Sequence, residues 1–422
     1  MNKAKRSPKA AQFALVATLP VATLLQACGG DSEPATGLVT GVMTGIDVLV
    51  AEDFERLRGL SVGLITNQTG VDRSGASTID RLHRAPEVDL VALFSPEHGI
   101  RGAADPGALV SDTVDRRTGL IVHSLYGQTR RPTDAMLAGL DALVFDIQGV
   151  GVRYYTYQWT MALAMSAAAG AGIEFIVLDR PNPIDGLSVQ GNVLDPAFAT
   201  FVGLYPVAMR HGLTGGELAL LLNDHFALGA RLTVVEMEGW ERRMAFDDTG
   251  LGWISPSPNM PTALTALHYA GLCLFEGTNL SVGRGTDRPF EQIGAPWLDG
   301  QALAAWLRSQ DLPGVRFEAV TFTPHGPGDG KFADEPLNGV RFIATDRGSY
   351  DPTRTAVAAL TGVRTLHPER LEWTEAHFDR LAGTDRLRLA VQAGLEWPEI
   401  VSDWESQASD FRALRQPYLL YP

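Results

Sequence analysis

Four runs of consecutive apolar residues, each ending in polar ones, constrain this chain more than any other feature. The runs are SVGLIT (61–66), VDLVALF (88–94), DALVFDI (141–147) and IEFIVLD (173–179). Strands that are covered on both faces of a parallel sheet have such unbroken apolar sequences. Helical patterns lie between these runs, at residues 77–85, 133–140 and 157–172. The alternation predicts a fold of the α/β class built on an open, mostly parallel sheet.

The pattern changes near residue 240. Before it, residues 214–227 have a capping box (Thr214 with Glu217) that predicts a helix, and residues 231–237 predict a further strand. After it comes a proline-rich loop at 252–262, then strands at 315–322 and 340–346 and a helix at 353–366. We therefore expect a first domain over residues 45–238 and a smaller α+β domain over residues 239–422.

The N-terminus is typical of an exported lipoprotein. Four basic residues (Lys3, Lys5, Arg6 and Lys9) precede an apolar stretch that ends in LQAC, residues 25–28. This pattern predicts a signal peptide over 1–27, lipidation of Cys28 and a flexible tether over 28–44. An ordinary secretory peptide with a chance cysteine is the alternative. Gly29 and Gly30 lack the aspartate that retains lipoproteins in the inner membrane, which favours a periplasm-facing anchor in the outer membrane.

Charge and absent motifs exclude several classes of function. The net charge is −14 and becomes −18 when the four positive charges of residues 1–27 are removed, so we expect no nucleic acid partner. The sequence has no H-E-x-x-H, no cysteine pair for zinc, no G-x-S-x-G and no G-x-G-x-x-G. We expect neither a metal nor a cofactor. Cys273 is expected to be a buried apolar residue.

Polar residues follow each of the four apolar runs. They include Asn67, Glu97, His98, Asp146, Gln148 and Asp179. The carboxyl ends of parallel strands share one edge of a sheet, where ligands bind, so these side chains are expected to converge. Each residue also has a structural interpretation: Glu97 could cap the next segment, His98 and Asp146 could be satisfied in the core, and Asp179 could fix a turn.

Two further segments carry candidate residues. Arg153 lies among tyrosines, including Tyr155, where it could hold an anion or pack at the start of a helix. The glycine-rich stretch 275–297 predicts an ordered loop without helix or strand, and it offers Glu276, Asn279, Arg284 and Arg288. The residues left after exclusion are mainly carboxylates with arginines and tyrosines, and paired carboxylates are typical of glycoside hydrolysis.

Seven motifs in order resemble the bacterial exo-β-N-acetylmuramidase family, long known only as a domain of unknown function. They are GLITNQTGVD, LFSPEHGIRG, VFDIQGVGVRYYTY, LDRPNPIDG, PSPNMPT, EGTNLSVGRGTDRPFEQIGAPW and RQPYLLY, and they extend from about Gly45 to Tyr421. The resemblance implies a Rossmann-like domain, a C-terminal domain and an active site in the cleft between them. It implies removal of terminal N-acetylmuramic acid from the non-reducing ends of peptidoglycan fragments.

The resemblance also implies roles for particular residues. Glu97 matches the leading catalytic carboxylate, most simply the general acid, while Asp146 and Glu276 are candidates for the second group. The family commonly has an aspartate after FDIQ, where this chain has Gly149. The expected substrates are muropeptides or the MurNAc-GlcNAc disaccharide. The lactyl carboxylate of muramic acid requires a cation, for which Arg101, Arg153, Arg284, Arg288 and His98 are candidates.

Two other classes of function remain open on the sequence alone. A sugar-binding lipoprotein would also have two α/β lobes around a cleft, but it would not turn over a substrate. A metal-dependent hydrolase could use Glu97, His98, Asp146 and His211, and its activity would be sensitive to EDTA.

Overall fold

The computed structural model of this chain describes residues 41–102 and 107–422. The predicted signal peptide and Cys28 lie outside these residues, as does most of the tether. Residues 41–44 were assigned to the tether but belong to the folded unit, where Met43 forms a β-bridge with Glu238. Across the described ranges, no helix has the length and apolar character needed to cross a membrane.

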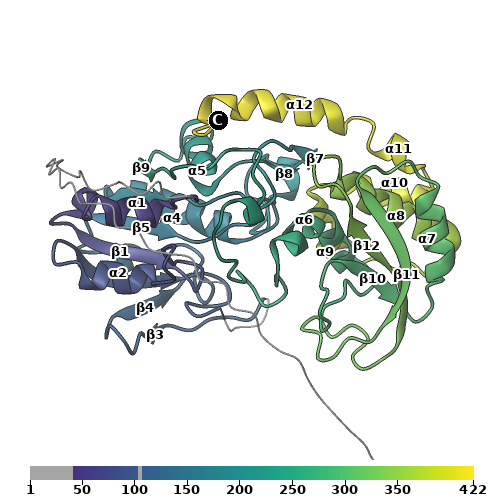
Figure 1. Cartoon of the computed structure of the whole chain (residues 1–422), viewed down its shortest axis with the longest axis horizontal. Coiled ribbons are helices and arrows are strands. Elements are labelled where there is room, and N and C mark those ends of the chain that lie inside the picture. Colours follow the sequence, from purple (N-terminus) through teal and green to yellow (C-terminus); the bar gives the residue numbers. More distant parts are fainter. Residues whose placement is uncertain (1–40, 103–106) are drawn as a thin grey trace, which may run out of the picture. The chain divides into compact units, whose positions relative to one another are not determined.

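A seven-stranded sheet forms the first domain (Figure 1). Its strand order is β3-β4-β2-β1-β5-β6-β9, and all neighbouring pairs are parallel except β3 with β4. The strands are β1 (Ser61–Thr66), β2 (Asp89–Ser95), β3 (Thr113–Val114), β4 (Ile121–Ser124), β5 (Ala142–Asp146), β6 (Glu174–Leu178) and β9 (Arg231–Val235). The five strands predicted for this domain are confirmed. The short strands β3 and β4 were not predicted.

Helices cover both faces of this sheet, as the unbroken apolar strands require. Alternate strand residues such as Val62 and Val144 pack with α1 and α2 in one core, and Ile65 and Phe145 pack with α4 and α5 in another. The helices are α1 (Gly45–Ala51), α2 (Thr78–Arg84), α3 (Asp134–Leu137), α4 (Tyr157–Ala171) and α5 (Gly215–Asp224). The predicted capping box at Thr214 is present at the start of α5.

The second domain is built around a small antiparallel sheet of order β10-β12-β11. Its strands are β10 (Gln292–Ala295), β11 (Val315–Phe322) and β12 (Leu337–Ala344). Its helices are α6 (Ala263–Leu272), α7 (Gly300–Arg308), α8 (Pro352–Leu366), α9 (Glu375–Ala382), α10 (Arg386–Ala393) and α11 (Trp397–Ile400). The prediction that residues 275–297 contain no strand was wrong, because residues 292–295 pair with β12.

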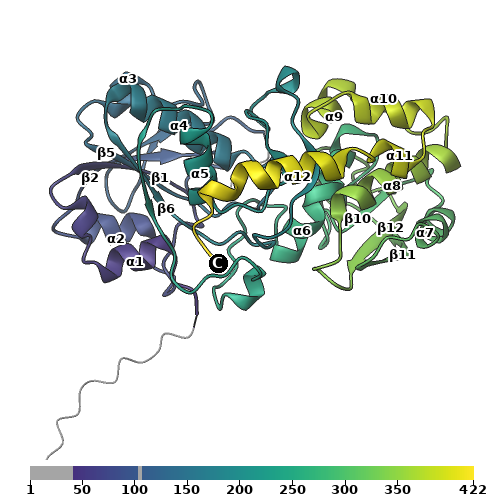
Figure 2. The same ribbon diagram turned by 90° about the horizontal axis from the view of Figure 1, so that it is seen from above.

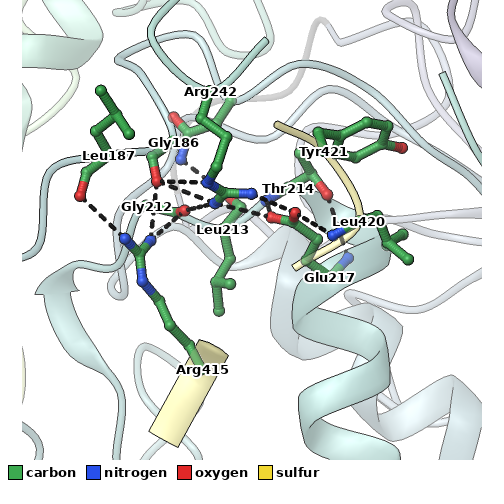
Figure 3. Close-up of polar contacts among 12 residues, drawn as sticks. Gly186, Leu187, Gly212, Leu213, Thr214, Glu217, Arg242, Arg415, Leu420 and Tyr421 are labelled. Atoms are coloured by element: carbon green, nitrogen blue, oxygen red, sulfur yellow. Dashed lines mark hydrogen bonds and ion pairs between the residues drawn. The ribbon is translucent and has the colours of Figure 1, made fainter. Parts of the chain in front are cut away.

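The C-terminal segment returns to the first domain. Helix α12 (Trp404–Arg415) runs from the second domain back to the first, as Figures 1 and 2 show. It packs along the two-stranded sheet of β7 (Gln190–Val193) and β8 (Ala208–Arg210). Arg415 donates to the carbonyls of Gly186 and Leu187, and it lies beside a buried ion pair between Arg242 and Glu217 (Figure 3). These contacts join the end of the chain to α5. The predicted boundary between residues 238 and 239 stays a prediction.

Candidate active site

A cavity of about 300 Å³ is lined by residues of both domains. The first domain contributes Glu97, His98, Tyr126, Tyr154, Tyr155, Thr156 and Tyr157, and the second contributes Tyr269, Glu276, Arg284, Phe290, His377 and Arg380. Five of the twelve catalytic or substrate-binding residues predicted from the sequence therefore meet here: Glu97, His98, Tyr155, Glu276 and Arg284. Its volume lies at the small end of the range of roughly 300–1,000 Å³ for ligand pockets.

Glu97 follows the carboxyl end of β2, in a tight turn. His98 and Gly99 have φ angles of 68° and 75°, in the left-handed region that a residue with a side chain rarely adopts. The turn brings the Glu97 carboxylate to two donors. The Gly107 amide donates to Oε1 at 2.9 Å, and the Thr156 hydroxyl donates to Oε2 at 2.6 Å. The carboxylate is thereby oriented by segments far apart in sequence.

Glu276 lies in a 3₁₀ turn (Cys273–Gly277) directly after α6. Arg284 donates to its Oε1 through Nε at 2.7 Å and forms an ion pair with it. Lys331 holds the same segment in place, because its ammonium group donates to the carbonyls of Glu276, Thr278 and Leu280. Burial lowers the pKa of Lys331 from its ordinary value. Glu276 is therefore an ion-paired carboxylate on a firmly held loop.

Aromatic rings from both domains form part of the cavity wall. Tyr155 meets Tyr157 edge-to-face at 5.0 Å and Tyr269 at 5.9 Å, and Tyr269 meets Phe290 in the same way at 4.7 Å. Such contacts contribute about 0.5–1.5 kcal/mol each beyond burial. They join the segment after β5 to helix α6, and aromatic faces of this kind are suited to packing against a sugar ring.

The tyrosines remain protonated at neutral pH. Burial, followed by the charge of Glu97, raises the pKa of Tyr126 to about 12. Burial also raises the pKa values of Tyr155, Tyr157 and Tyr269 well above 10. The hydroxyl of Tyr157 donates to the carbonyl of Pro256, and that of Tyr154 donates to the carbonyl of Ala270. Tyrosines of the wall that are not bonded in this way can donate to oxygen atoms of a ligand.

The structure does not bring Asp146 into this cavity. Its side chain is completely buried, and it accepts hydrogen bonds from Arg180 at 2.5 and 2.9 Å and from Thr78 at 2.5 Å. A buried carboxylate is stable when it is paired in this way. The geometry therefore favours the structural interpretation of Asp146 and leaves Glu276 as the predicted candidate for the second carboxylate at the site, where Asp329 also lines the cavity.

Arg153 is also outside the cavity. Its side chain is completely buried, and the guanidinium donates to the carbonyls of Asn192, Val207, Leu381 and Ala382. No donor pair is left for a substrate anion. Arg153 instead joins the end of α9 to β7 and the residues before β8, which agrees with the packing alternative for this residue.

The other five predicted residues are outside the cavity for different reasons. Arg101 pairs with Asp115 and Arg288 with Glu291, and both arginines are about half exposed. The side chains of Asn67 and Asn279 form hydrogen bonds that stabilise loops. Asn67 accepts from Thr69, and Asn279 donates to the carbonyl of Arg370. Gln148 donates to the carbonyls of Gly149 and Pro181 and lines a separate hollow next to Arg180. Their expected contacts with a substrate are not favoured by this geometry.

Gly149 lies beside a smaller cavity of about 40 Å³ that also includes Asp179 and His211. A Cβ atom at Gly149 would meet nothing within 4 Å, so a side chain has room there, and Gly149 is not among the residues that line the cavity of Glu97 and Glu276. Burial lowers the pKa of His211 to about 3. Among residues 41–102 and 107–422, no three His, Cys, Asp or Glu side chains are placed to hold a metal ion.

Several residues of the cavity were missed from the sequence. Thr156, Ser257 and Asn259 lie within recognised motifs, but the motifs did not indicate which of their residues face the site. His377 and Arg380 come from α9, in a segment without any recognised motif. The only signal there is a spacing of three residues, which puts both side chains on one face of a helix. That spacing is too common to identify a site.

Comparison with known proteins places most of the folded part of the chain in one family. Residues 62–264 match the family described as exo-beta-N-acetylmuramidase NamZ, N-terminal, and residues 267–421 match its C-terminal counterpart. The chain is 45% identical over 392 residues to peptidoglycan beta-N-acetylmuramidase NamZ of Bacillus subtilis (strain 168), covering 93% of this chain and 94% of that protein.

Two solved structures of Bacteroides fragilis NCTC 9343 proteins of the DUF1343 family are also similar. One has a TM-score of 0.85 and 41% identity, and covers 91% of this chain and 100% of that chain. The other has a TM-score of 0.73 and 29% identity, with 90% and 99% covered.

Proposed function

Because this chain belongs to the exo-β-N-acetylmuramidase NamZ family, we propose that it hydrolyses the glycosidic bond of a terminal, non-reducing N-acetylmuramic acid in peptidoglycan fragments. The observation that supports this most is the meeting of Glu97 and Glu276, from two domains, in one tyrosine-walled cavity. The small volume suits one terminal sugar.

Paired carboxylates divide the chemistry of glycoside hydrolysis between them. One protonates the oxygen of the leaving sugar, and the other supports positive charge at the anomeric carbon or activates water. We give Glu97 the first role, because it stands in a motif that resembles the one carrying the family's leading carboxylate. Glu276, which is already ion-paired with Arg284, is suited to act as a charged carboxylate in the second role. The tyrosine hydroxyls would hold the sugar oxygens.

Hydrolysis of a defined disaccharide tests this function. The purified protein is incubated with MurNAc-GlcNAc and with GlcNAc-MurNAc, and the products are identified by mass spectrometry. We expect free MurNAc and GlcNAc from the first compound only, because the enzyme removes a non-reducing MurNAc. Binding of MurNAc-GlcNAc without any release of sugar would instead indicate a sugar-binding protein.

We also propose that the chain is exported and anchored through a lipid on Cys28, facing the periplasm from the outer membrane. The support is the order of basic, apolar and small residues that ends at this cysteine. Labelling of cells with an alkyne fatty acid should mark the wild-type protein and leave the Cys28→Ser variant unmarked, and equal labelling of both would contradict the proposal.

A further inference from the structure

Arg380 is an exposed arginine of helix α9 that lines the cavity containing Glu97 and Glu276. Within the described part of the chain it forms no ion pair with a carboxylate, unlike Arg284, which is paired with Glu276 on the same cavity. A guanidinium is always charged and is weakly hydrated, so it commonly binds a planar anion. Glu97, Glu276 and Asp329 also line the cavity, but among the described residues none of them forms an ion pair with Arg380, so its guanidinium is available to an anionic ligand.

The side chain of Arg380 is oriented by His377, one turn earlier in the helix. Nη2 of Arg380 lies 2.5 Å from Nδ1 of His377. Because a guanidinium can only donate, Nδ1 must accept, and the imidazole is neutral with its proton on Nε2. Burial and the charge of Arg380 both lower the pKa of His377, in agreement with this state.

Helix α9 itself is firmly held. Phe378 is buried in the core, and Asp379 receives two hydrogen bonds from Arg388 at 2.8 and 2.7 Å. The carbonyls of Leu381 and Ala382 accept from the buried Arg153 of the first domain. A binding group on such an element keeps its position without much loss of entropy on binding.

Resting on the proposed function, we infer that Arg380 binds the lactyl carboxylate of the terminal N-acetylmuramic acid and so distinguishes it from N-acetylglucosamine. This carboxylate is the acidic group that muramic acid has and N-acetylglucosamine lacks. The other arginines considered for it are unsuitable: Arg284 is occupied by Glu276, Arg153 by carbonyls, and Arg101 and Arg288 lie outside the cavity. Arg380 is thus a specificity-determining residue supplied by the second domain.

The test compares two substrates that differ only at this carboxylate. They are 4-nitrophenyl β-N-acetylmuramide and the same compound with its lactyl group as a neutral amide. For the Arg380→Gln variant we expect kcat/KM on the acid to fall roughly 10- to 100-fold, the scale of a charge-assisted hydrogen bond, mostly through KM. On the amide we expect a change of less than about twofold. Arg380→Lys should restore part of the loss on the acid.

Arg386→Gln is the matched control, because Arg386 is an exposed arginine at the start of α10 and does not line this cavity. It should behave as the wild type on both substrates. If kcat/KM of Arg380→Gln falls equally on the acid and on the amide, or falls on neither, the assignment of Arg380 is overturned. If the wild type hydrolyses neither compound, the proposed function is overturned and this assignment with it.

Discussion

The hydroxyl of Thr156 forms a hydrogen bond with the candidate catalytic residue Glu97 and does not cap its own helix. It is the N-cap residue of α4, where a threonine side chain normally accepts from a backbone amide, yet no such bond is present. Its hydroxyl donates instead to Oε2 of Glu97 at 2.6 Å. A typical hydrogen bond contributes about 0.5–1.5 kcal/mol, so this contact favours one orientation of the Glu97 carboxyl group.

We expect Thr156→Val to lower kcat about 10-fold with little change in KM, because the carboxylate loses one of its two oriented donors. Thr156→Ser should restore most of the rate. Thr160 supplies a control one turn further along α4, since its buried hydroxyl has no hydrogen-bond partner among the described residues. Thr160→Val should keep wild-type kinetics. Steady-state rates on an aryl β-N-acetylmuramide check this, and wild-type kcat in Thr156→Val would contradict it.

Sequence reasoning worked best at this scale where a residue follows a strand. Glu97 and His98 were identified because the carboxyl end of β2 had to lie at the binding edge of a parallel sheet. The same rule predicted Asp146. This residue lies at the end of a strand as expected, but its carboxylate already accepts hydrogen bonds from Arg180 and Thr78. A sequence shows that a carboxylate is near the edge, but it does not show whether a buried partner already neutralises it.

At the scale of elements, the C-terminal segment is attached to the first domain by a hydrogen bond to Asp179. This buried carboxylate accepts from the amides of Arg180 and Gly216 and from the hydroxyls of Thr214 and Tyr421. Burial raises its pKa to about 6 despite these donors. Tyr421 is the second-to-last residue of the chain. The Asp179 carboxylate at the end of β6 therefore forms hydrogen bonds with both the N-cap residue of α5 and the C-terminal segment.

The pKa of Asp179 gives a pH dependence with a definite sign. The folded pKa is about 6 and the ordinary value is 3.8, so the folded state keeps a proton that the unfolded state loses. The contribution of Asp179 to stability is therefore fully present below about pH 4 and is lost as the pH rises through about 6. Above that pH the carboxylate is charged, and the hydrogen bonds from its hydroxyl donors then contribute most to its stability.

We expect Tyr421→Phe to reduce the free energy of unfolding more at pH 8 than at pH 5. At pH 8 the variant loses a hydrogen bond to a charged group, worth about 1.5–3 kcal/mol, and at pH 5 it loses a weaker bond to a mostly neutral one. Tyr418→Phe is the control, because Tyr418 donates near the surface to Asp224. Guanidinium unfolding at both pH values measures this, and an equal cost of Tyr421→Phe at pH 5 and pH 8 would rule out the titration of Asp179.

The elements themselves were largely predictable from the sequence. Strands β1, β2, β5, β6 and β9 are apolar on both faces and therefore stand out, and the Thr214 capping box correctly indicated the start of α5. Strand β10 was missed because its four residues, Gln292–Ala295, lie in a glycine-rich stretch and owe their conformation to pairing with β12. Such pairing is a tertiary effect that local propensity does not report.

At the scale of the whole molecule, one core extends through both domains. The same cluster contains Phe145 of β5, Tyr269 of α6 and Phe378 of α9. Arg153 and the tyrosines after β5 reinforce this junction. The cavity is therefore formed by packing between distant segments, which explains why α9 could not be assigned to the site from the sequence. The resemblance to a family could only indicate that a cleft exists.

The claim at this scale is that Glu97 of the first domain and Glu276 of the second act on one sugar. The most direct test is kcat of Glu97→Gln and Glu276→Gln on an aryl β-N-acetylmuramide with a poor leaving group. Glu375→Gln is the control, because Glu375 is an exposed residue at the start of α9 and does not line the cavity. We predict a loss of about 10²-fold or more for each of the first two variants, the scale of general acid–base catalysis, and no loss for the control. Near-wild-type kcat in either folded variant would contradict the two-carboxylate site.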